Sequence, residues 1–415
     1  MLFFPRSPHK NPMPGRFLTL ALSVYPLGAQ VSGPALTETQ AVALALARPE
    51  WQALTQLPAR QTEGGSLEAR TWLSPGVEWS QERFTGIQPG KREDTFLFSQ
   101  GIDVSGRWLA RREAALKREE AGKAESILRM AGVAAQVREA FYDLLTARER
   151  TTRVDRALGH LAKVQDQVDR LYAAGEMSGL DRGRVRREVE VLKGRQVQEH
   201  ASLLRAELRL GALIGDKVGS VRGDLLPPEP EPLEKLLGLQ QIAPGSTMTR
   251  AQEAAAQADA RAAQRWLPEL NLGLGVKRWQ ENGLSGNGSV LSLGFLFPAP
   301  GRIKGSRIRA EAEARAAGAQ AKLQREQDEA ELRALWKEAA EFRSSAERLT
   351  REALADPAKV EATLEAAFAQ GEMELLARLD GSRSLLEAEL AALEQVSRAR
   401  RACIALDRML GKVNP

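Results

Sequence analysis

The sequence has few of the residues on which catalytic and metal sites usually depend. It contains one cysteine, Cys403, and three histidines, His9, His160 and His200, among 415 residues. A single cysteine cannot form an internal disulfide, and three scattered histidines are too few for a metal cage or an acid–base centre. No phosphate-binding loop, nucleophile elbow or dinucleotide fingerprint is present. We therefore expect a protein that is not an enzyme and that uses no cofactor or metal site.

Aromatic residues are also scarce, at 5%, whereas charged residues reach 27%. Ala, Leu, Glu and Arg dominate the rest, a composition that favours long helices over a thick mixed core. The 59 basic and 54 acidic residues give a net charge of +5, which is a small excess on a densely charged surface. Because the sequence has no zinc finger, helix-turn-helix or aromatic-basic platform, we do not expect nucleic acid as a partner.

The apolar run near the N-terminus, residues 17–24, is too short to span a bilayer as a helix. It follows Arg16 and precedes small residues, which is the order of a secretory signal. We therefore expect residues 1–29 to be a signal peptide; the alternative is a disordered tail. Met13 gives a more ordinary signal start than Met1, so residues 1–12 are a candidate upstream artefact. No cysteine lies near the cleavage point, so no lipid anchor is expected.

A three-residue motif occurs twice in the chain. The two copies are Gly175-Glu176-Met177 and Gly371-Glu372-Met373. Each copy precedes about forty residues of expected helix that end at a glycine, Gly215 or Gly411, and the offset is 196 at both ends. Such gapless registration indicates an old internal duplication. We expect a first repeat over 30–226, a Pro-rich connector over 227–243, a second repeat over 244–411 and a tail over 412–415.

Long helices are expected in both repeats. Residues 107–174 contain no proline, and 68 residues in one helix would extend roughly 100 Å. From Val185 to Leu213 apolar positions recur at the 3.5-residue period of coiled coils. In the second repeat Asp356-Pro357 should kink or break the incoming helix. In the first repeat a short helix over 36–47 should be followed by a break near Pro58.

Two segment pairs alternate between apolar and small or polar residues with a period of two, which indicates β-hairpins. The expected apolar face consists of Phe96, Phe98, Ile102, Val104, Leu270, Leu272, Leu274, Val276, Leu291, Leu293, Phe295 and Phe297. Turn-rich loops are expected at 86–94 and 280–289. Strands of about ten residues are long enough to cross a membrane when tilted. The alternative is a pair of soluble hairpins on a small core. Four strands cannot close a barrel, so in a membrane several chains must contribute to one.

The order of these parts resembles that of the outer-membrane efflux protein (TolC-like) family. The resemblance rests on four sequence segments. They are Leu36-Thr37 to Leu46-Ala47-Arg48, Trp266-Leu267-Pro268-Glu269-Leu270, Gly371-Glu372-Met373-Glu374-Leu375-Leu376 and Leu385-Leu386-Glu387-Ala388-Glu389-Leu390. The stretch from Gln100 to Arg107 is most similar to the branch that serves heavy-metal cation efflux.

The resemblance implies an α+β membrane protein with duplicated halves, in which a long α-helical coiled-coil barrel joins four transmembrane β-strands per chain. A homotrimer would form a 12-stranded barrel in outer-membrane lipid, with the helices in the periplasm. Both Gly-Glu-Met turns would then be the periplasmic tips that meet an adaptor (membrane fusion) protein and an inner-membrane pump. Asp380 matches an acidic entrance-gate position of the family, but Ala377 stands where a second acid would be.

The function implied by the resemblance is that of the outer-membrane channel of a tripartite efflux system. Such a channel is a passive exit duct for small toxic compounds or metal cations. Two alternatives stay open on the sequence, a type I protein-export channel and a periplasmic coiled-coil scaffold or adaptor. A scaffold would not need an apolar strand face of membrane length.

Overall fold

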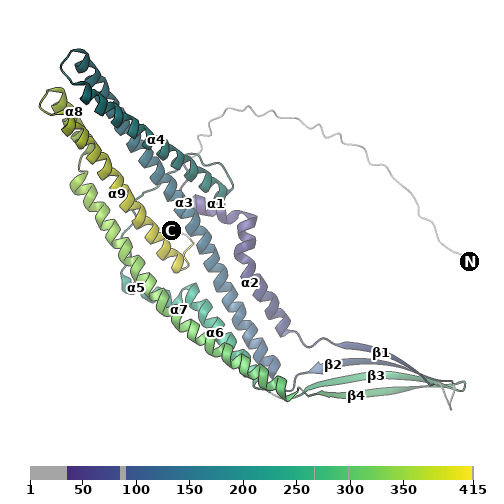
Figure 1. Ribbon diagram of the computed structural model, residues 1–415. Coiled ribbons are helices and arrows are strands. Elements are labelled where there is room, and N and C mark those ends of the chain that lie inside the picture. Colours follow the sequence, from purple (N-terminus) through teal and green to yellow (C-terminus); the bar gives the residue numbers. More distant parts are fainter. Residues whose placement is uncertain (1–34, 85–89, 266, 298, 414–415) are drawn as a thin grey trace, which may run out of the picture.

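The computed structural model describes residues 35–84, 90–265, 267–297 and 299–413. The expected signal peptide, the start-site question and Trp266 lie outside these residues. Figure 1 shows an elongated molecule in which long helices run side by side and a narrow sheet extends from one end. Among the described residues no helix is both long enough and apolar enough to cross a membrane.

The first repeat is built around one very long helix. Its helices are α1 (Glu38–Ala47), α2 (Pro49–Arg70), α3 (Arg107–Ala173) and α4 (Gly179–Ile214). The first helix begins with a capping box, in which the Thr37 hydroxyl accepts from Gln40 N and the Gln40 side chain accepts from Thr37 N. The predicted long helix is confirmed, since α3 is continuous over 67 residues.

The second repeat has the same returning helix but a segmented incoming one. Its elements are α6 (Pro244–Ala263), α7 (Pro300–Arg348), a π-helical turn η1 (Leu349–Ala353), α8 (Pro357–Ala369) and α9 (Leu375–Met409). The predicted interruption is confirmed, because Pro357 opens α8 and Asp356 caps it by accepting from Lys359 N at 3.0 Å. Residues 233–242 of the expected connector form a further helix, α5 (Leu233–Ile242).

The predicted break near Pro58 is wrong, because α2 continues through this residue. Proline has no N–H to donate to the carbonyl four residues before it. Here α3 supplies the missing bonds. Arg129 Nη1 donates to Leu54 O at 3.4 Å, and Ser126 Oγ accepts from Ala59 N at 3.1 Å. Polar side chains from a segment about 70 residues away therefore bond to α2 on both sides of its proline.

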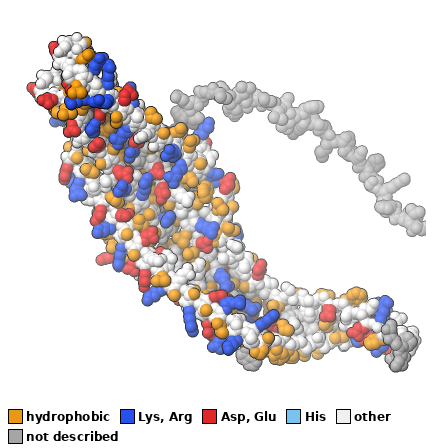
Figure 2. Space-filling model, in the orientation of Figure 1, with side chains coloured by type: hydrophobic (Ala, Val, Ile, Leu, Met, Phe, Trp, Pro, Cys, Tyr) orange, Lys and Arg blue, Asp and Glu red, His pale blue; other side chains and the backbone are white. Residues whose placement is uncertain are grey.

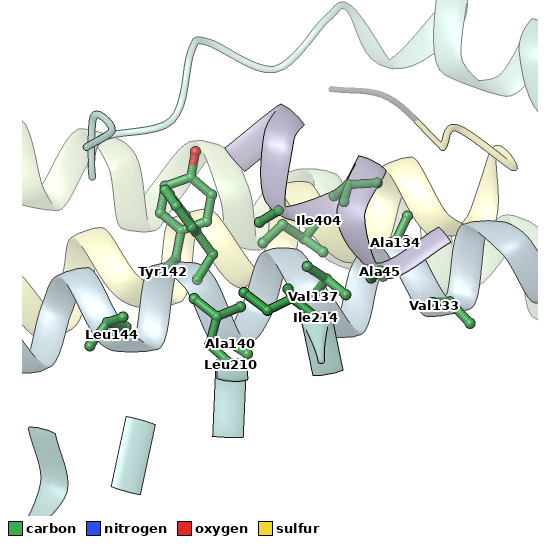
Figure 3. Close-up of a cluster of buried hydrophobic side chains, with 14 residues drawn as sticks. Ala45, Val133, Ala134, Val137, Ala140, Tyr142, Leu144, Leu210, Ile214 and Ile404 are labelled. Atoms are coloured by element: carbon green, nitrogen blue, oxygen red, sulfur yellow. The ribbon is translucent and has the colours of Figure 1, made fainter. Parts of the chain in front are cut away.

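The main core is small-residue packing between helices. Figure 3 shows α1 lying on α3 with α4 and α9 beside it, and Ala45, Val137, Leu210 and Ile404 meet there, all fully buried or nearly so. Alanines let helix backbones approach closely, so long helices can pack along much of their length without many aromatic residues.

A buried charge cluster ties three of these helices together. Arg138 of α3 pairs with Glu38 of α1 at 2.5 Å and with Asp407 of α9 at 3.0 Å. The Tyr142 hydroxyl donates to Glu38 Oε2 at 2.6 Å, and burial together with this carboxylate raises the pKa of Tyr142 above its ordinary value. The arrangement joins the N-terminal helix to the C-terminal one across the duplication.

The four strands form one antiparallel sheet in the order β1-β2-β3-β4. Their bounds are β1 (Gly76–Phe84), β2 (Lys91–Ile102), β3 (Glu269–Glu281) and β4 (Leu284–Leu296). The predicted hairpins are confirmed, and pairing of β2 with β3 joins them across the two repeats. The second loop prediction is wrong, because the strands continue to a two-residue turn, Asn282-Gly283. Both residues have positive φ, as a tight hairpin turn requires. The first loop is also shorter than predicted, since β2 begins at Lys91.

Candidate functional site: an apolar sheet face and two helical tips

The predicted apolar side chains lie together on one face of the sheet. Residues paired directly across strands point to the same side, and one such row runs Val77, Phe98, Leu274 and Leu291 across all four strands. A parallel row places Ile102 beside Leu270 and Phe295, and the others follow in register. Val104 and Phe297 lie just beyond the ends of β2 and β4, and both are exposed.

This face is open to its surroundings. Its side chains are exposed by 50% at Phe98 and by up to 80% at Val77. The sequence analysis missed two members, Val77 and Trp79 of β1, because the alternation there is mixed with charged residues. They pair with Phe98 and Phe96. A continuous exposed apolar surface that extends across four strands marks a membrane or protein contact.

The opposite face is mostly small and polar, as predicted, with Leu97, Val290 and Trp279 as apolar exceptions. The row next to the apolar one runs Gly76, Ser99, Gly273 and Ser292 across the four strands. Farther toward the turns, Glu93 lies between Lys91 and Lys277 and pairs with both. The sheet therefore separates an apolar side from a side that water and charge can occupy.

The two Gly-Glu-Met turns have the same backbone structure. Gly175 and Gly371 have φ of 81° and 76°, the left-handed region that favours glycine. In the first turn Glu176 N donates to Leu171 O at 2.9 Å, and in the second Glu372 N donates to Ala367 O at 3.0 Å. These are Schellman caps at helix C-termini. The predicted helix reversals are thus confirmed as structure.

The turns lie side by side at the end of the helices farthest from the sheet (Figure 1). Met177 of the first turn packs against a cluster that includes Phe368 and Leu375 of the second. Gly175, Glu176, Gly371 and Glu372 are exposed, whereas Met177 and Met373 are half-buried.

Asp380 lies on α9 and is exposed. Nearer the turns, the equivalent residues Leu180 and Leu376 are exposed by 60% and 61%. Exposed leucines at the same place in both repeats suit a protein contact. They keep the offset of 196 residues between the repeats, but the sequence analysis did not include them in the tip.

A buried charge pair beside the second turn was also missed. Arg378 is 1% exposed, and its Nη2 donates to Glu361 Oε1 at 2.5 Å, while Ser382 contacts the same guanidinium. His160 of α3 places Nδ1 3.8 Å from Glu361. The residue equivalent to Arg378 in the first repeat is Arg182. It is partly exposed, pairs with Asp169 at 2.5 Å and stacks on Tyr172.

Metal-binding side chains are not gathered at either surface. Within the residues that the structure describes, no group of three or more His, Cys, Asp or Glu side chains is placed to hold a metal ion.

No protein-family model matches the chain. It is 27% identical over 366 residues to the cobalt-zinc-cadmium resistance protein CzcC of Cupriavidus metallidurans, covering 85% of this chain and 84% of that protein. Its fold matches the outer membrane protein VceC of Vibrio cholerae, with a TM-score of 0.77 at 19% identity, covering 90% of this chain and 96% of that one.

The fold also matches the CmeC outer membrane channel of Campylobacter jejuni, with a TM-score of 0.76 at 14% identity over 91% of this chain and 86% of the other. A third match is CusC, with a TM-score of 0.72 at 16% identity over 90% of this chain and 92% of the other. The resemblance to outer-membrane efflux proteins of the TolC-like type, predicted from the sequence, is confirmed.

Proposed function

We propose that this chain, which has the fold of outer-membrane efflux channels, is the outer-membrane component of a tripartite efflux system. In this proposal it is a passive exit duct in the cell outer membrane, with its helices in the periplasm. The observation that carries the proposal is the sheet, in which an exposed apolar row lies beside a Gly/Ser row on the opposite face. Lipid would cover the first face, and the second would line a water-filled lumen.

The sheet also supports a trimer. Its outer strands, β1 and β4, each have one edge without a partner strand within the described chain. Unpaired backbone groups are not tolerated in lipid, so the edges must be closed by other copies. Three copies of four strands would form a 12-stranded barrel, and the helices below would then form the walls of a hollow cylinder.

Metal cations are the favoured substrates. The relative that matches over most of both chains is named for resistance to cobalt, zinc and cadmium. Among the alternatives, a soluble scaffold is disfavoured by the exposed apolar face, whereas a protein-export channel would share both the sheet and the helices. The partners in the proposed system are a periplasmic adaptor and an inner-membrane pump, which would meet the two tips. In this proposal the exposed Asp380 of α9 is the gate residue near the second tip.

Disulfide trapping between protomers tests the barrel. Ser80 of β1 faces the polar side, and Gly288, Val290 and Ser292 share that side on β4. In a Cys403→Ser background, Ser80→Cys combined with a cysteine at one of the three β4 positions should give covalent trimers after oxidation in outer membranes. The matched control mixes two single-cysteine variants, which can form dimers but no closed ring. Only monomers in all three pairs would contradict the barrel.

Substrate class is tested separately by cellular metal content. A host that lacks its own channel should retain less zinc and cobalt when this chain is expressed with a compatible adaptor and pump. Unchanged metal content together with restored secretion of a type I export substrate would favour the protein-export alternative.

A further inference from the structure

A hollow lined by arginines lies where the helices meet the sheet. Five guanidinium side chains from three helix ends line it, those of Arg107, Arg111, Arg265, Arg302 and Arg309. They come from the start of α3, the segment after α6 and the start of α7. Figure 2 shows Lys and Arg side chains gathered at this junction, next to the base of the sheet. We call this surface the arginine hollow.

The arginines of the hollow form no close ion pair with the described part of the chain. Over the described residues, none of the five has an Asp or Glu oxygen within 4.0 Å. Two acidic residues, Asp259 and Glu313, line the same hollow. Asp259 pairs with Arg118 outside the five, and Glu313 leaves the arginines of the hollow in excess. Along the helical body, by contrast, many arginines form ion pairs, such as Arg150 with Glu199 and Arg383 with Glu188.

Backbone contacts hold part of the hollow in place without cancelling its charge. Arg107 Nε donates to Arg265 O at 2.7 Å, and Arg265 Nη1 donates to Ser105 O at 3.2 Å. Arg111, Arg302 and Arg309 are exposed. The hollow thus combines two positioned guanidiniums with three that are free to meet an anion.

Helix direction adds to the positive potential. The N-terminal end of a helix carries partial positive charge, and acidic residues are normally favoured there. The start of α3 is capped by the Asp103 carboxylate, which accepts from Trp108 N, whereas α7 has no acidic residue in its first turn. Both helices begin at this junction. Clustering arginines at the start of α7 is unfavourable within the chain alone, so an external anion would stabilise the arrangement there.

Neighbouring side chains indicate what kind of anion. Trp72 and Trp108 lie with ring centroids 6.4 Å apart at the base of the sheet, and Arg112 lies over the Trp108 ring. Tryptophans concentrate at the level of lipid headgroups, where one end of the ring is apolar and the other is wet. The apolar sheet face begins immediately beyond this point.

We propose that the arginine hollow binds the phosphate groups of anionic phospholipids in the leaflet that faces the helices. The proposal rests on the proposed function, because it needs the sheet to span a membrane. The hollow would then fix how deep the sheet sits, since its charges stop at the headgroup level while the apolar rows enter the hydrocarbon. Long arginine side chains suit this role because their stems can lie along apolar surface while the charged ends reach phosphate.

The test compares lipid binding to the full chain by native mass spectrometry in mild detergent. The probes are phosphatidylglycerol and phosphatidylcholine, added separately. The variant Arg111→Gln/Arg302→Gln/Arg309→Gln should bind phosphatidylglycerol at least about tenfold more weakly, because each arginine near an anionic lipid surface contributes a factor of roughly five. Phosphatidylcholine binding should change little. The matched control, Arg187→Gln/Arg205→Gln/Arg351→Gln, removes three exposed arginines on the helical body and should bind phosphatidylglycerol as the wild type does.

Several outcomes would overturn the inference. Equal loss of phosphatidylglycerol in both triple variants would show a general charge effect. Displacement of the lipid by excess inorganic phosphate would show a free-anion site instead of a lipid surface. Reconstitution separates this failure from failure of the proposed function. If wild type and variants all enter vesicles of either lipid but show no headgroup preference, only the hollow is wrong. If the wild type enters no vesicle, the membrane assignment itself is wrong.

Discussion

The two tips share one backbone turn but are supported differently. At the first tip the incoming helix is the continuous α3, and Arg182 lies at the surface. At the second tip the incoming helix is interrupted by η1 and a proline, and the equivalent Arg378 is fully buried against Glu361. The duplication has therefore kept the turn and changed what holds it. The first tip is the end of one continuous helix, α3. The second tip follows the short helix α8, and a buried ion pair between Glu361 and Arg378 joins α8 to α9.

The largest expected difference comes from removing the two equivalent arginines. Arg378→Met should destabilise the α8 region by about 3–5 kcal/mol, because it leaves the Glu361 carboxylate buried without its partner. Arg182→Met should cost under about 1 kcal/mol, because its ion pair with Asp169 is partly exposed. Hydrogen exchange of α8 and of the C-terminal turns of α3 measures both. The double variant Arg378→Met/Glu361→Leu should recover most of the loss. Equal effects of the two single changes would remove the contrast between the tips.

The next effect concerns the shared turn. Valine at Gly175 or Gly371 forces a β-branched residue into a positive φ, at a cost of about 1–3 kcal/mol. No heavy atom lies within 4 Å of an added Cβ at either position, so the strain comes from the backbone alone. We expect Gly371→Val to impair coupling to the pump, measured as efflux, while trimers still assemble. The control is Gly194→Val within α4, where space is equally open and φ is helical. Undiminished efflux in Gly371→Val would argue against a tip role.

Removing a helix N-cap should also affect the second tip more than the first, but by a smaller amount. Asp356→Ala removes the cap of α8 and should cost about 1 kcal/mol. Ser178→Ala removes the cap of α4, where the hydroxyl accepts from Asp181 N at 3.1 Å, and should cost a similar amount. Because α8 is 13 residues long and α4 is 36, the same loss should unfold more of the second tip. Hydrogen exchange in the first turn of each helix would reveal this, and equal fraying would count against a weaker second tip.

The smallest effect is the response of the first tip to pH. The hydrogen bond from Arg182 lowers the pKa of Asp169 below its ordinary value of 3.8. A lowered folded pKa stabilises the fold at pH above the ordinary value, and this contribution is lost as pH falls through the lower folded value. We expect Arg182→Gln to lower the stability of the first tip near neutral pH and to leave it unchanged in strong acid, where Asp169 is protonated. Hydrogen-exchange rates at the first tip, compared between wild type and variant from neutral to strongly acidic pH, measure this difference. An effect that does not change with pH would exclude the ion pair as its cause.

Much of this architecture could be predicted from local sequence patterns. The recurrence of Gly-Glu-Met located both turns because each turn needs a glycine with positive φ at the end of its helix. The period-two alternation identified the apolar face because neighbours along a strand alternate sides whatever their partners are. Val77 and Trp79 were missed since their strand is interrupted by charged residues, and only pairing with β2 shows that they complete the rows.

Features that depend on distant segments could not be predicted in this way. Arg378 looks like any arginine on a charged helix, and its burial depends on Glu361, which lies across the turn on another helix. The arginine hollow combines three helix ends that are far apart in the chain. The wrong prediction of a break at Pro58 has the same origin, because the side chains that bond to the backbone around this proline come from α3.

The contact between α2 and α3 has a consequence for the order of folding. Alone, α2 would leave Leu54 O without the donor that Pro58 lacks. Arg129 donates to this oxygen, and Ser126 accepts from Ala59 N, only after the helices dock. Gly122 allows that docking, because a Cβ there would lie 2.7 Å from Pro58 O. We therefore expect α3 to act as a template on which α2 forms late. Residues 58, 122, 126 and 129 would then be constrained to change together in evolution.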